Sequence, residues 1–105
     1  MAQYLKTKAD FDEALNKDQL VVVNFTNTWA PDCEMIAPKF EELAKEFEGS
    51  ALFYKVDMDE NGETANKCAI IAMPTFHFYW MRKKVHQIEG ADFDGVRAKV
   101  MELKD

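Results

Sequence analysis

Hydrophobic residues along the chain follow two alternating spacings, one typical of buried strands and the other of amphipathic helices. The valine-rich run at residues 20–25 predicts a strand buried on both faces, and further strands are expected at residues 51–57, 75–80 and 84–89. Apolar side chains three or four positions apart predict helices at residues 9–16 and 31–48 and from Phe93 onward, with a weaker helix at 62–68. The last two strands follow each other so closely that they are expected to pair as a hairpin.

The order of these elements predicts the fold class. Taken as βαβαβα, then a β-hairpin, then a final helix, the chain predicts an α/β fold whose mainly parallel sheet gains an antiparallel edge from the hairpin. We expect a mixed sheet of about five strands flanked by about four helices. Glycine and proline are scarce, and no repeat or linker is visible, so residues 1–105 are expected to form one domain.

The start of the helix at 31–48 concentrates unusual residues. Pro31 suits the first helical position, where its missing N–H would have no partner, and Asp32 complements the helix dipole. Cys33 lies in the first turn, at the carboxyl end of a strand, where open α/β sheets place their sites. The dipole favours a thiolate there, so Cys33 is a candidate redox residue. Pro38 lies inside the helix, and a kink is expected at that point.

Composition and charge exclude several classes of function. The chain carries 13 Lys and Arg against 19 Asp and Glu, a formal net charge of −6, and its pI is near 4.9. Nucleic acids and anionic membranes bind clustered positive charge, so neither is an expected partner. A hydrophobic content of 48% argues against disorder. No apolar run approaches the roughly 20 residues of a membrane span.

The number of cysteines and the first residues of the chain indicate the cellular location that is expected for the protein. Two cysteines are too few for a disulfide-dense secreted scaffold. The first six residues lack the apolar stretch of a secretory signal. A reducing, cytoplasmic location is therefore expected. We expect no cofactor and a monomeric protein.

Several motifs carry a resemblance to a known family. Residues 21–25 run into the turn Trp29–Cys33 (WAPDC), and Met73-Pro74-Thr75 follows before Gly90-Ala91. Across essentially its whole length the chain resembles the thioredoxin family. The resemblance implies a thioredoxin-like fold, reduction of protein disulfides through two cysteines, and a thioredoxin reductase-type electron donor. It also implies a cis peptide bond before Pro74, in a loop that faces the redox turn.

The chain departs from the family at the positions that carry the chemistry. The resemblance places the attacking cysteine of the family at Ala30, whose methyl group cannot attack a disulfide, and leaves only the resolving position, Cys33. Asn24 occupies the position of the family's buried acid, and an amide cannot accept the proton of the resolving thiol. Asp32 is expected to raise the pKa of the neighbouring thiol by charge repulsion. Arg82 stands where the family usually has glycine in the final hairpin turn, which leaves the turn type open.

The expected function is therefore that of a disulfide oxidoreductase scaffold that is disabled or restricted to one-thiol chemistry. Extended peptide segments or disulfide-containing proteins are the expected partners, in a groove formed by Trp29, Pro31, Asp32, Met73, Pro74 and Gly90. The alternatives are a redox-silent binding module, a one-thiol protein that removes glutathione from other proteins, and a homodimer formed through the apolar surface around Trp29. Ala30 is either the natural residue or a deliberate replacement of cysteine, and the sequence leaves both open.

Other cysteine and histidine residues are interpreted as structural. Cys68 is expected to pack as a small residue, too far from the redox turn to form a disulfide. Strand alternation places His77 on a half-exposed face with Thr75 and Tyr79. His77 and His86, taken with the cysteines, fit no zinc-ligand spacing, so no metal site is expected.

For two charged features the sequence leaves both a functional and a structural role open. Lys55 is expected either to pair with a buried acid, where a family member has one, or to be a plain surface lysine. An acidic run is expected to form a solvated loop, with cation binding as the minor alternative, and it comprises Asp57, Asp59, Glu60 and Glu63.

Overall fold

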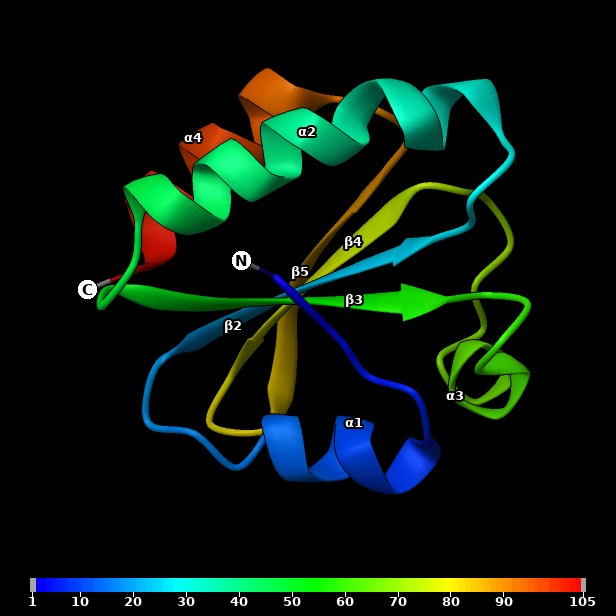
Figure 1. The fold of residues 1–105 in the computed structure, drawn as a ribbon. Coiled ribbons are helices and arrows are strands. Elements are labelled where there is room, and N and C mark those ends of the chain that lie inside the picture. The colour runs from blue at the N-terminus through cyan, green and yellow to red at the C-terminus, as the bar shows by residue number, and fades with distance from the viewer. Residues whose placement is uncertain (1, 105) are drawn as a thin grey trace.

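The structure is a computed structural model, and it describes residues 2–104. Its centre is a five-stranded sheet in the order β1-β3-β2-β4-β5, with helices on both faces (Figure 1). The strands are β1 (Gln3–Tyr4), β2 (Leu20–Thr26), β3 (Ala51–Asp57), β4 (Thr75–Trp80) and β5 (Lys83–Glu89). The helices are α1 (Lys8–Ala14), α2 (Pro31–Glu46), α3 (Gly62–Lys67) and α4 (Phe93–Leu103). The element order βαβαβαββα and the mixed sheet confirm the predicted α/β fold.

Strand β4 runs in a direction that the sequence pattern did not predict. Strands β1 and β2 are both parallel to β3, whereas β4 is antiparallel to β2 as well as to β5. A helix that returned the chain along a strand of seven residues would span about 23 Å, but the six residues of α3 span only about 9 Å. Because α3 stays near the carboxyl end of β3 (Figure 1), the chain enters β4 from that end and runs back.

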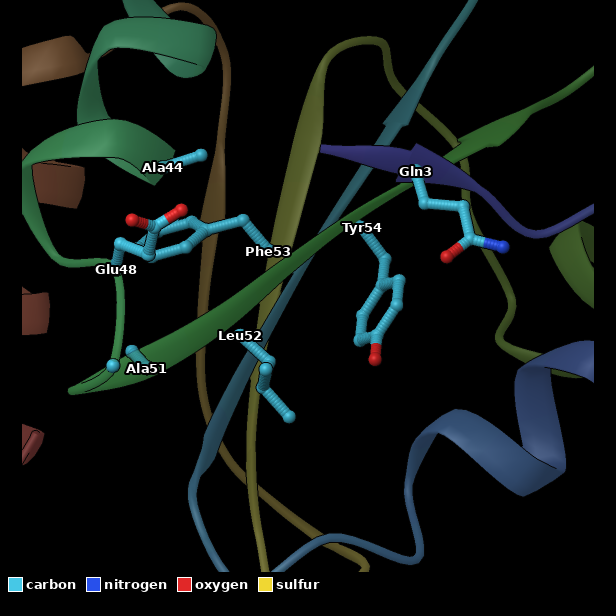
Figure 2. Close-up of a pocket in the computed structure, with 8 residues that line it drawn as sticks. Gln3, Ala44, Glu48, Ala51, Leu52, Phe53 and Tyr54 are labelled. Carbon is cyan, nitrogen blue, oxygen red and sulfur yellow. The ribbon is translucent and has the colours of Figure 1, made fainter. Parts of the chain in front are cut away.

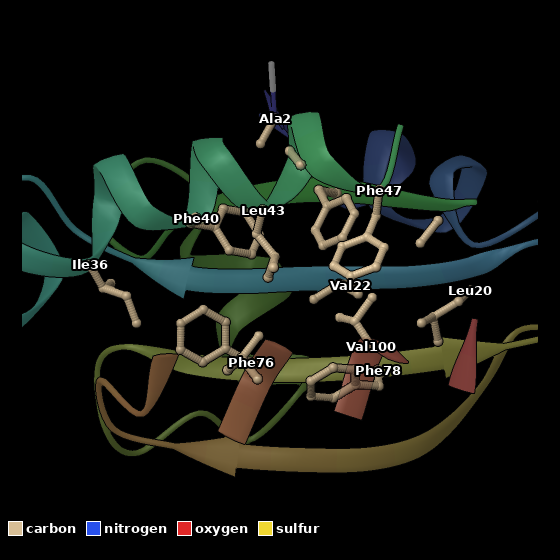
Figure 3. Close-up of a cluster of buried hydrophobic side chains, with 14 residues drawn as sticks. Ala2, Leu20, Val22, Ile36, Phe40, Leu43, Phe47, Phe76, Phe78 and Val100 are labelled. Carbon is tan, nitrogen blue, oxygen red and sulfur yellow. The ribbon is translucent and has the colours of Figure 1, made fainter. Parts of the chain in front are cut away.

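Strand β2 is buried along its whole length and separates two hydrophobic cores. Leu20 and Val22 belong to the core beneath α2 and α4 (Figure 3). Val21, Val23 and Phe25 belong to the core on the opposite face, which α1 covers. Because successive side chains of a strand point to opposite faces, the valine-rich run supplies both cores at once, as the sequence predicted.

Helix α2 begins at Pro31, as predicted, and ends at Glu46. Its N-cap residue is Ala30, whose side chain makes no hydrogen bond to the first turn. Pro38 lies within the helix. After the helix, Gly49 has a φ of +87°, a left-handed conformation that glycine adopts without steric cost. The chain then turns directly into β3.

The face of β4 that carries His77 is buried, so the prediction of a half-exposed face is wrong. His77 and Thr75 are each 1% exposed, and Tyr79 is 6% exposed. The reason is that β4 lies inside the sheet, between β2 and β5. On this face Phe11 of α1 packs edge-on against the Tyr79 ring, with 5.8 Å between the ring centroids. An interior strand with helices on both faces has no solvent-exposed face.

The turn between β4 and β5 places two residues in the left-handed region. The φ angle is +51° at Met81 and +71° at Arg82. A two-residue hairpin turn of type I′ requires positive φ at both central positions and favours Asn-Gly for that reason. Arg82 therefore keeps the turn geometry, but its Cβ brings steric strain of about 1 kcal/mol.

The variant Arg82→Gly is expected to raise the free energy of unfolding by about 0.5–1 kcal/mol, because glycine removes that strain. The exposed hydrogen bond from Arg82 to Asn16 is lost and offsets only part of the gain. Urea unfolding followed by circular dichroism measures the difference. Lys83→Gly, one residue later in β5, should instead lower stability, because glycine weakens an extended strand. Equal effects of the two variants would contradict this account.

Candidate functional site

The turn after β2 is held by one buried side chain, that of Asn27. Its Oδ1 accepts hydrogen bonds from the backbone N–H groups of Trp29 and Ala30, at 3.1 and 2.8 Å. Its Nδ2 donates to the sulfur of Met73 at 3.1 Å. One amide therefore fixes the turn into α2 and links it to the loop before β4. Sequence reasoning missed Asn27, although an asparagine two or three residues before the amides it binds is a recognised turn signal.

The two positions of the expected redox motif lie in different surroundings. Ala30 is partly exposed, whereas Cys33 is 1% exposed. The carbonyl of Ala30 accepts a hydrogen bond from the N–H of Glu34 at 3.0 Å, which begins the helical pattern. The thiols of Cys33 and Cys68 are both free. The accessible position of the turn thus carries a methyl group, and protein covers the thiol three residues later.

The loop before β4 lies against the same turn. The Met73–Pro74 peptide bond is cis, and the carbonyl of Pro74 accepts a hydrogen bond from the N–H of Gly90 at 2.7 Å. Gly90 has a φ of +95°, which favours glycine. Together with the Asn27–Met73 contact, these bonds bring Trp29, Met73–Pro74 and Gly90 to one end of the sheet. Pro31 and Asp32, exposed at the start of α2, lie at the same turn.

Trp29 projects from the turn and is 63% exposed. Its indole N–H donates to Oδ2 of Asp59 at 3.0 Å. Oδ1 of Asp57 in turn accepts hydrogen bonds from the backbone N–H groups of Asp59 and Glu60, at 2.8 and 3.2 Å. Part of the acidic segment therefore orients the indole ring, a role that sequence reasoning missed.

A cavity of about 300 Å³ beside the turn is lined by Asn24, Cys33 and Lys55, among others. Asn24 is buried, and its Oδ1 has no hydrogen-bond partner among the described residues. The Lys55 ammonium pairs with Oε2 of Glu41 at 2.8 Å and lies 4.3 Å from the centroid of the Tyr4 ring. Lys55 thus pairs with an acid, but the acid comes from α2 and not from position 24.

Glu41 receives hydrogen bonds from two parts of the chain. The Ala2 N–H donates to Oε1 and the Lys55 ammonium donates to Oε2, both at 2.8 Å. Partial burial by itself raises the pKa of the Glu41 carboxyl, but these hydrogen bonds and the charge of Lys55 together bring that pKa below its ordinary value of about 4.5. Glu41, which sequence reasoning missed, therefore anchors α2 to β3 beside the cavity.

Several other features lie away from this turn. A cavity of about 230 Å³ at the edge of the sheet includes none of the predicted site residues and is lined by Gln3, Ala44, Glu48, Leu52, Phe53 and Tyr54, among others (Figure 2). His77 contacts Phe25 in one core, whereas His86 contacts Phe78 of the other. Within residues 2–104, no group of three or more His, Cys, Asp or Glu side chains is placed to hold a metal ion. No described helix has the length and apolar character needed to cross a bilayer.

Comparison with known proteins identifies the family. The thioredoxin family model matches residues 3–102. The chain is 50% identical over 107 residues to thioredoxin from Geodia cydonium, covering 99% of this chain and 100% of that protein. The solved structure of Fasciola hepatica thioredoxin matches with a TM-score of 0.92 at 40% identity, over 96% of this chain and 98% of that one. Malassezia sympodialis thioredoxin matches with a TM-score of 0.93 at 33% identity, over 100% and 92% of the two chains. The chain belongs to the thioredoxin family, and the predicted thioredoxin-like fold is confirmed.

Replacing Asn27 with alanine is expected to lower the free energy of unfolding by about 2 kcal/mol, because three hydrogen bonds of a buried amide are lost together. Asn27→Asp keeps an acceptor for the two backbone N–H groups and should recover part of the loss. Asn66→Ala, on the exposed surface of α3, is the matched control and should change stability by less than about 0.5 kcal/mol. Urea unfolding tests all three variants. A loss no larger for Asn27→Ala than for the control would contradict the assigned role.

Glu41→Gln is expected to destabilise the protein by about 1 kcal/mol at pH 7, because Lys55 loses its charged partner. A carboxyl whose pKa is lower in the folded state stabilises that state above its unfolded pKa, and the contribution disappears as pH falls through the folded pKa. The difference between parent and variant should therefore be constant above about pH 5 and shrink as the pH falls below about 4.5. Thermal unfolding from pH 7 to pH 3 measures it, with the exposed Glu42→Gln as control. A difference that does not change over this pH range would contradict the pairing.

Proposed function

We propose that this chain keeps the peptide-docking surface of the thioredoxin family but does not perform the two-cysteine disulfide reduction. The observation that carries the proposal is the composition of the turn, with Ala30 at its accessible position and the thiol of Cys33 buried. Members of the family act on protein disulfides and are reduced by thioredoxin reductase. That cycle starts from a sulfur atom that this chain lacks.

The chemistry of disulfide reduction explains why one thiol is insufficient. A thiolate attacks one sulfur of the substrate disulfide, forms a mixed disulfide and releases the first substrate thiolate. A second thiolate then attacks the mixed disulfide, so that two electrons pass to the substrate and an intramolecular disulfide remains. The Ala30 methyl group cannot perform the first step. Cys33 has no partner in the turn with which to complete the second.

The surroundings of Cys33 support the same conclusion. Departure of the resolving thiol's proton requires a group that can accept it. In the adjoining cavity the side chain at position 24 is an amide, which does not accept a proton near neutral pH. Glu41, the carboxylate that pairs with Lys55 beside that cavity, already accepts hydrogen bonds from Lys55 and Ala2. Any chemistry of Cys33 is therefore limited to one-thiol reactions.

The docking surface is supported by the contacts that hold the turn. Trp29 is exposed and oriented by Asp59, and the Met73–Pro74 loop is tied to Asn27 and Gly90. Ile71, 87% exposed just before this loop, adds apolar surface that sequence reasoning missed. We propose that an extended peptide segment docks across this end of the sheet, with Pro31 and Asp32 at its border. Backbone groups in the loop before β4 are suited to pair with such a segment.

Restoring the sulfur tests the proposal. In a protein-disulfide reduction assay with insulin and dithiothreitol, the parent chain should match the rate of the reductant alone, whereas Ala30→Cys should exceed it at least about tenfold. Ala30→Ser is the matched control, because a hydroxyl of similar size cannot exchange with a disulfide, and it should stay at the reductant rate. Adding Asn24→Asp to Ala30→Cys should raise the rate further, because a carboxylate can accept the thiol proton.

Two results would contradict the proposal. Turnover by the parent chain above the reductant rate would show that a sulfur at position 30 is unnecessary. Background rates for Ala30→Cys, with or without Asn24→Asp, would show that the rest of the site no longer supports thioredoxin chemistry.

A further inference from the structure

A third cavity lies on the face of the sheet covered by α1 and α3. These helices have seven and six residues, so each spans only about 10 Å along its axis and neither covers the whole face. In Figure 1 they lie on the opposite side of the sheet from α2 and α4. A cavity of about 410 Å³ lies among α1, the end of α3, β4 and β5. None of its lining residues belongs to the turn or to the loop before β4.

Aromatic groups line the interior of this cavity. Phe11 and Tyr79 meet edge to face, with 5.8 Å between their centroids. The His77 ring lies 5.9 Å from the Tyr79 ring and is itself buried. Flat, apolar walls of this kind favour a flat, apolar ligand group, since aromatic rings pack well at offset or edge-on geometries.

A hydrogen-bonded chain in the wall ends in an unpartnered nitrogen. The Cys68 sulfur lies 3.9 Å from the Tyr79 hydroxyl, which lies 3.0 Å from Nδ1 of His77. Nε2 of His77 is buried and has no hydrogen-bond partner among the described residues. Gln87 lies opposite His77 across the β4–β5 pair and its side chain interacts with the His77 ring, while its Oε1 also accepts from the Lys84 ammonium at 2.7 Å. A buried polar atom without a partner is costly unless a ligand supplies one.

The protonation states of His77, Cys68 and Tyr79 determine which hydrogen bonds the His77 ring can form. Burial, with a smaller contribution from the charge of Lys84, lowers the pKa of His77 to about 4, so the ring is neutral at pH 7. Burial also raises the pKa of the Cys68 thiol and of the Tyr79 hydroxyl, so both keep their protons. A neutral imidazole carries one ring hydrogen, so one of its two nitrogens donates and the other accepts. Nδ1 is occupied by the Tyr79 hydroxyl, which leaves Nε2 as the ring nitrogen that a ligand can engage.

Three lysines border the same cavity, although the chain has a net charge of −6. Lys8 is paired with Asp12 at 2.6 Å. Neither Lys67 nor Lys84 takes part in an ion pair among the described residues. Two cations without a carboxylate partner at the mouth of an aromatic cavity favour an anion.

We propose that this cavity binds a small organic anion with a flat aromatic body. The aromatic body packs on Phe11 and Tyr79, the anionic group pairs with Lys67 and Lys84, and a polar atom of the ligand forms a hydrogen bond with Nε2 of His77. A volume of about 410 Å³ is within the range of small-molecule sites and holds a two-ring acid. The proposal does not rest on the proposed function, because the two sites share no residue.

The test uses naphthalene-2-carboxylate and the full chain, with binding followed by NMR chemical-shift changes of the backbone amides. Saturable changes centred on Cys68, His77 and Tyr79 are expected. Naphthalene-2-carboxamide has the same rings without the charge, and inorganic phosphate has the charge without the rings. Each should bind at least about tenfold more weakly than the acid.

Charge reversal provides the matched comparison. The double variant Lys67→Glu/Lys84→Glu should bind the acid at least about tenfold more weakly than the parent. Lys39→Glu/Lys45→Glu makes the same change of charge on α2, on the other side of the sheet, and should keep the parent affinity. Equal affinity of the two double variants, equal affinity of the acid and either probe, or shifts centred on Trp29 instead of His77 would each overturn the proposal.

Discussion

Burial of β2 on both faces is the constraint on which the rest of the molecule depends. The strand contributes to both cores, holds β3 on one side and β4 on the other, and ends at the turn into α2. Two polar side chains near its end, Asn24 and Asn27, are buried as a consequence. A buried amide is costly without hydrogen bonds. Asn27 obtains them from the turn and from the loop before β4, so burial of the strand also determines where the proposed docking surface forms.

Docking geometry and redox chemistry depend on different kinds of atoms in this protein. The turn is held through the backbone of position 30, whose N–H binds Asn27 and whose carbonyl accepts from Glu34. Neither bond involves the side chain. A sulfur atom at that position, or a carboxylate at position 24, carries the chemistry but does not hold the turn. This separation explains how a thioredoxin-family chain with alanine at position 30 can keep the surrounding architecture.

The periodicity of the sequence was sufficient to predict the order of the elements, the double burial of β2 and the start of α2 at Pro31, because these depend on local patterns. The direction of β4 depends on the length of α3, which is too short to carry the chain back to the other end of the sheet. The burial of His77 depends on which strands flank β4. Neither is visible in a local pattern. Contacts that complete the site join residues far apart in the sequence: Met73 follows Asn27 by 46 positions, and Asp59 follows Trp29 by 30. Such partners are identified only once the fold brings them together.

The hydrogen bond from Trp29 to Asp59 also has a spectroscopic consequence. It holds an exposed indole in one orientation at the end of the sheet where a peptide would lie, whereas the second tryptophan, Trp80, sits at the opposite end of β4. Indole emission moves to shorter wavelength when water is excluded from the ring. A bound peptide that covers Trp29 would therefore shift the emission of Trp29 and leave that of Trp80 unchanged as an internal reference. Peptide binding can thus be followed by the fluorescence of the unlabelled protein.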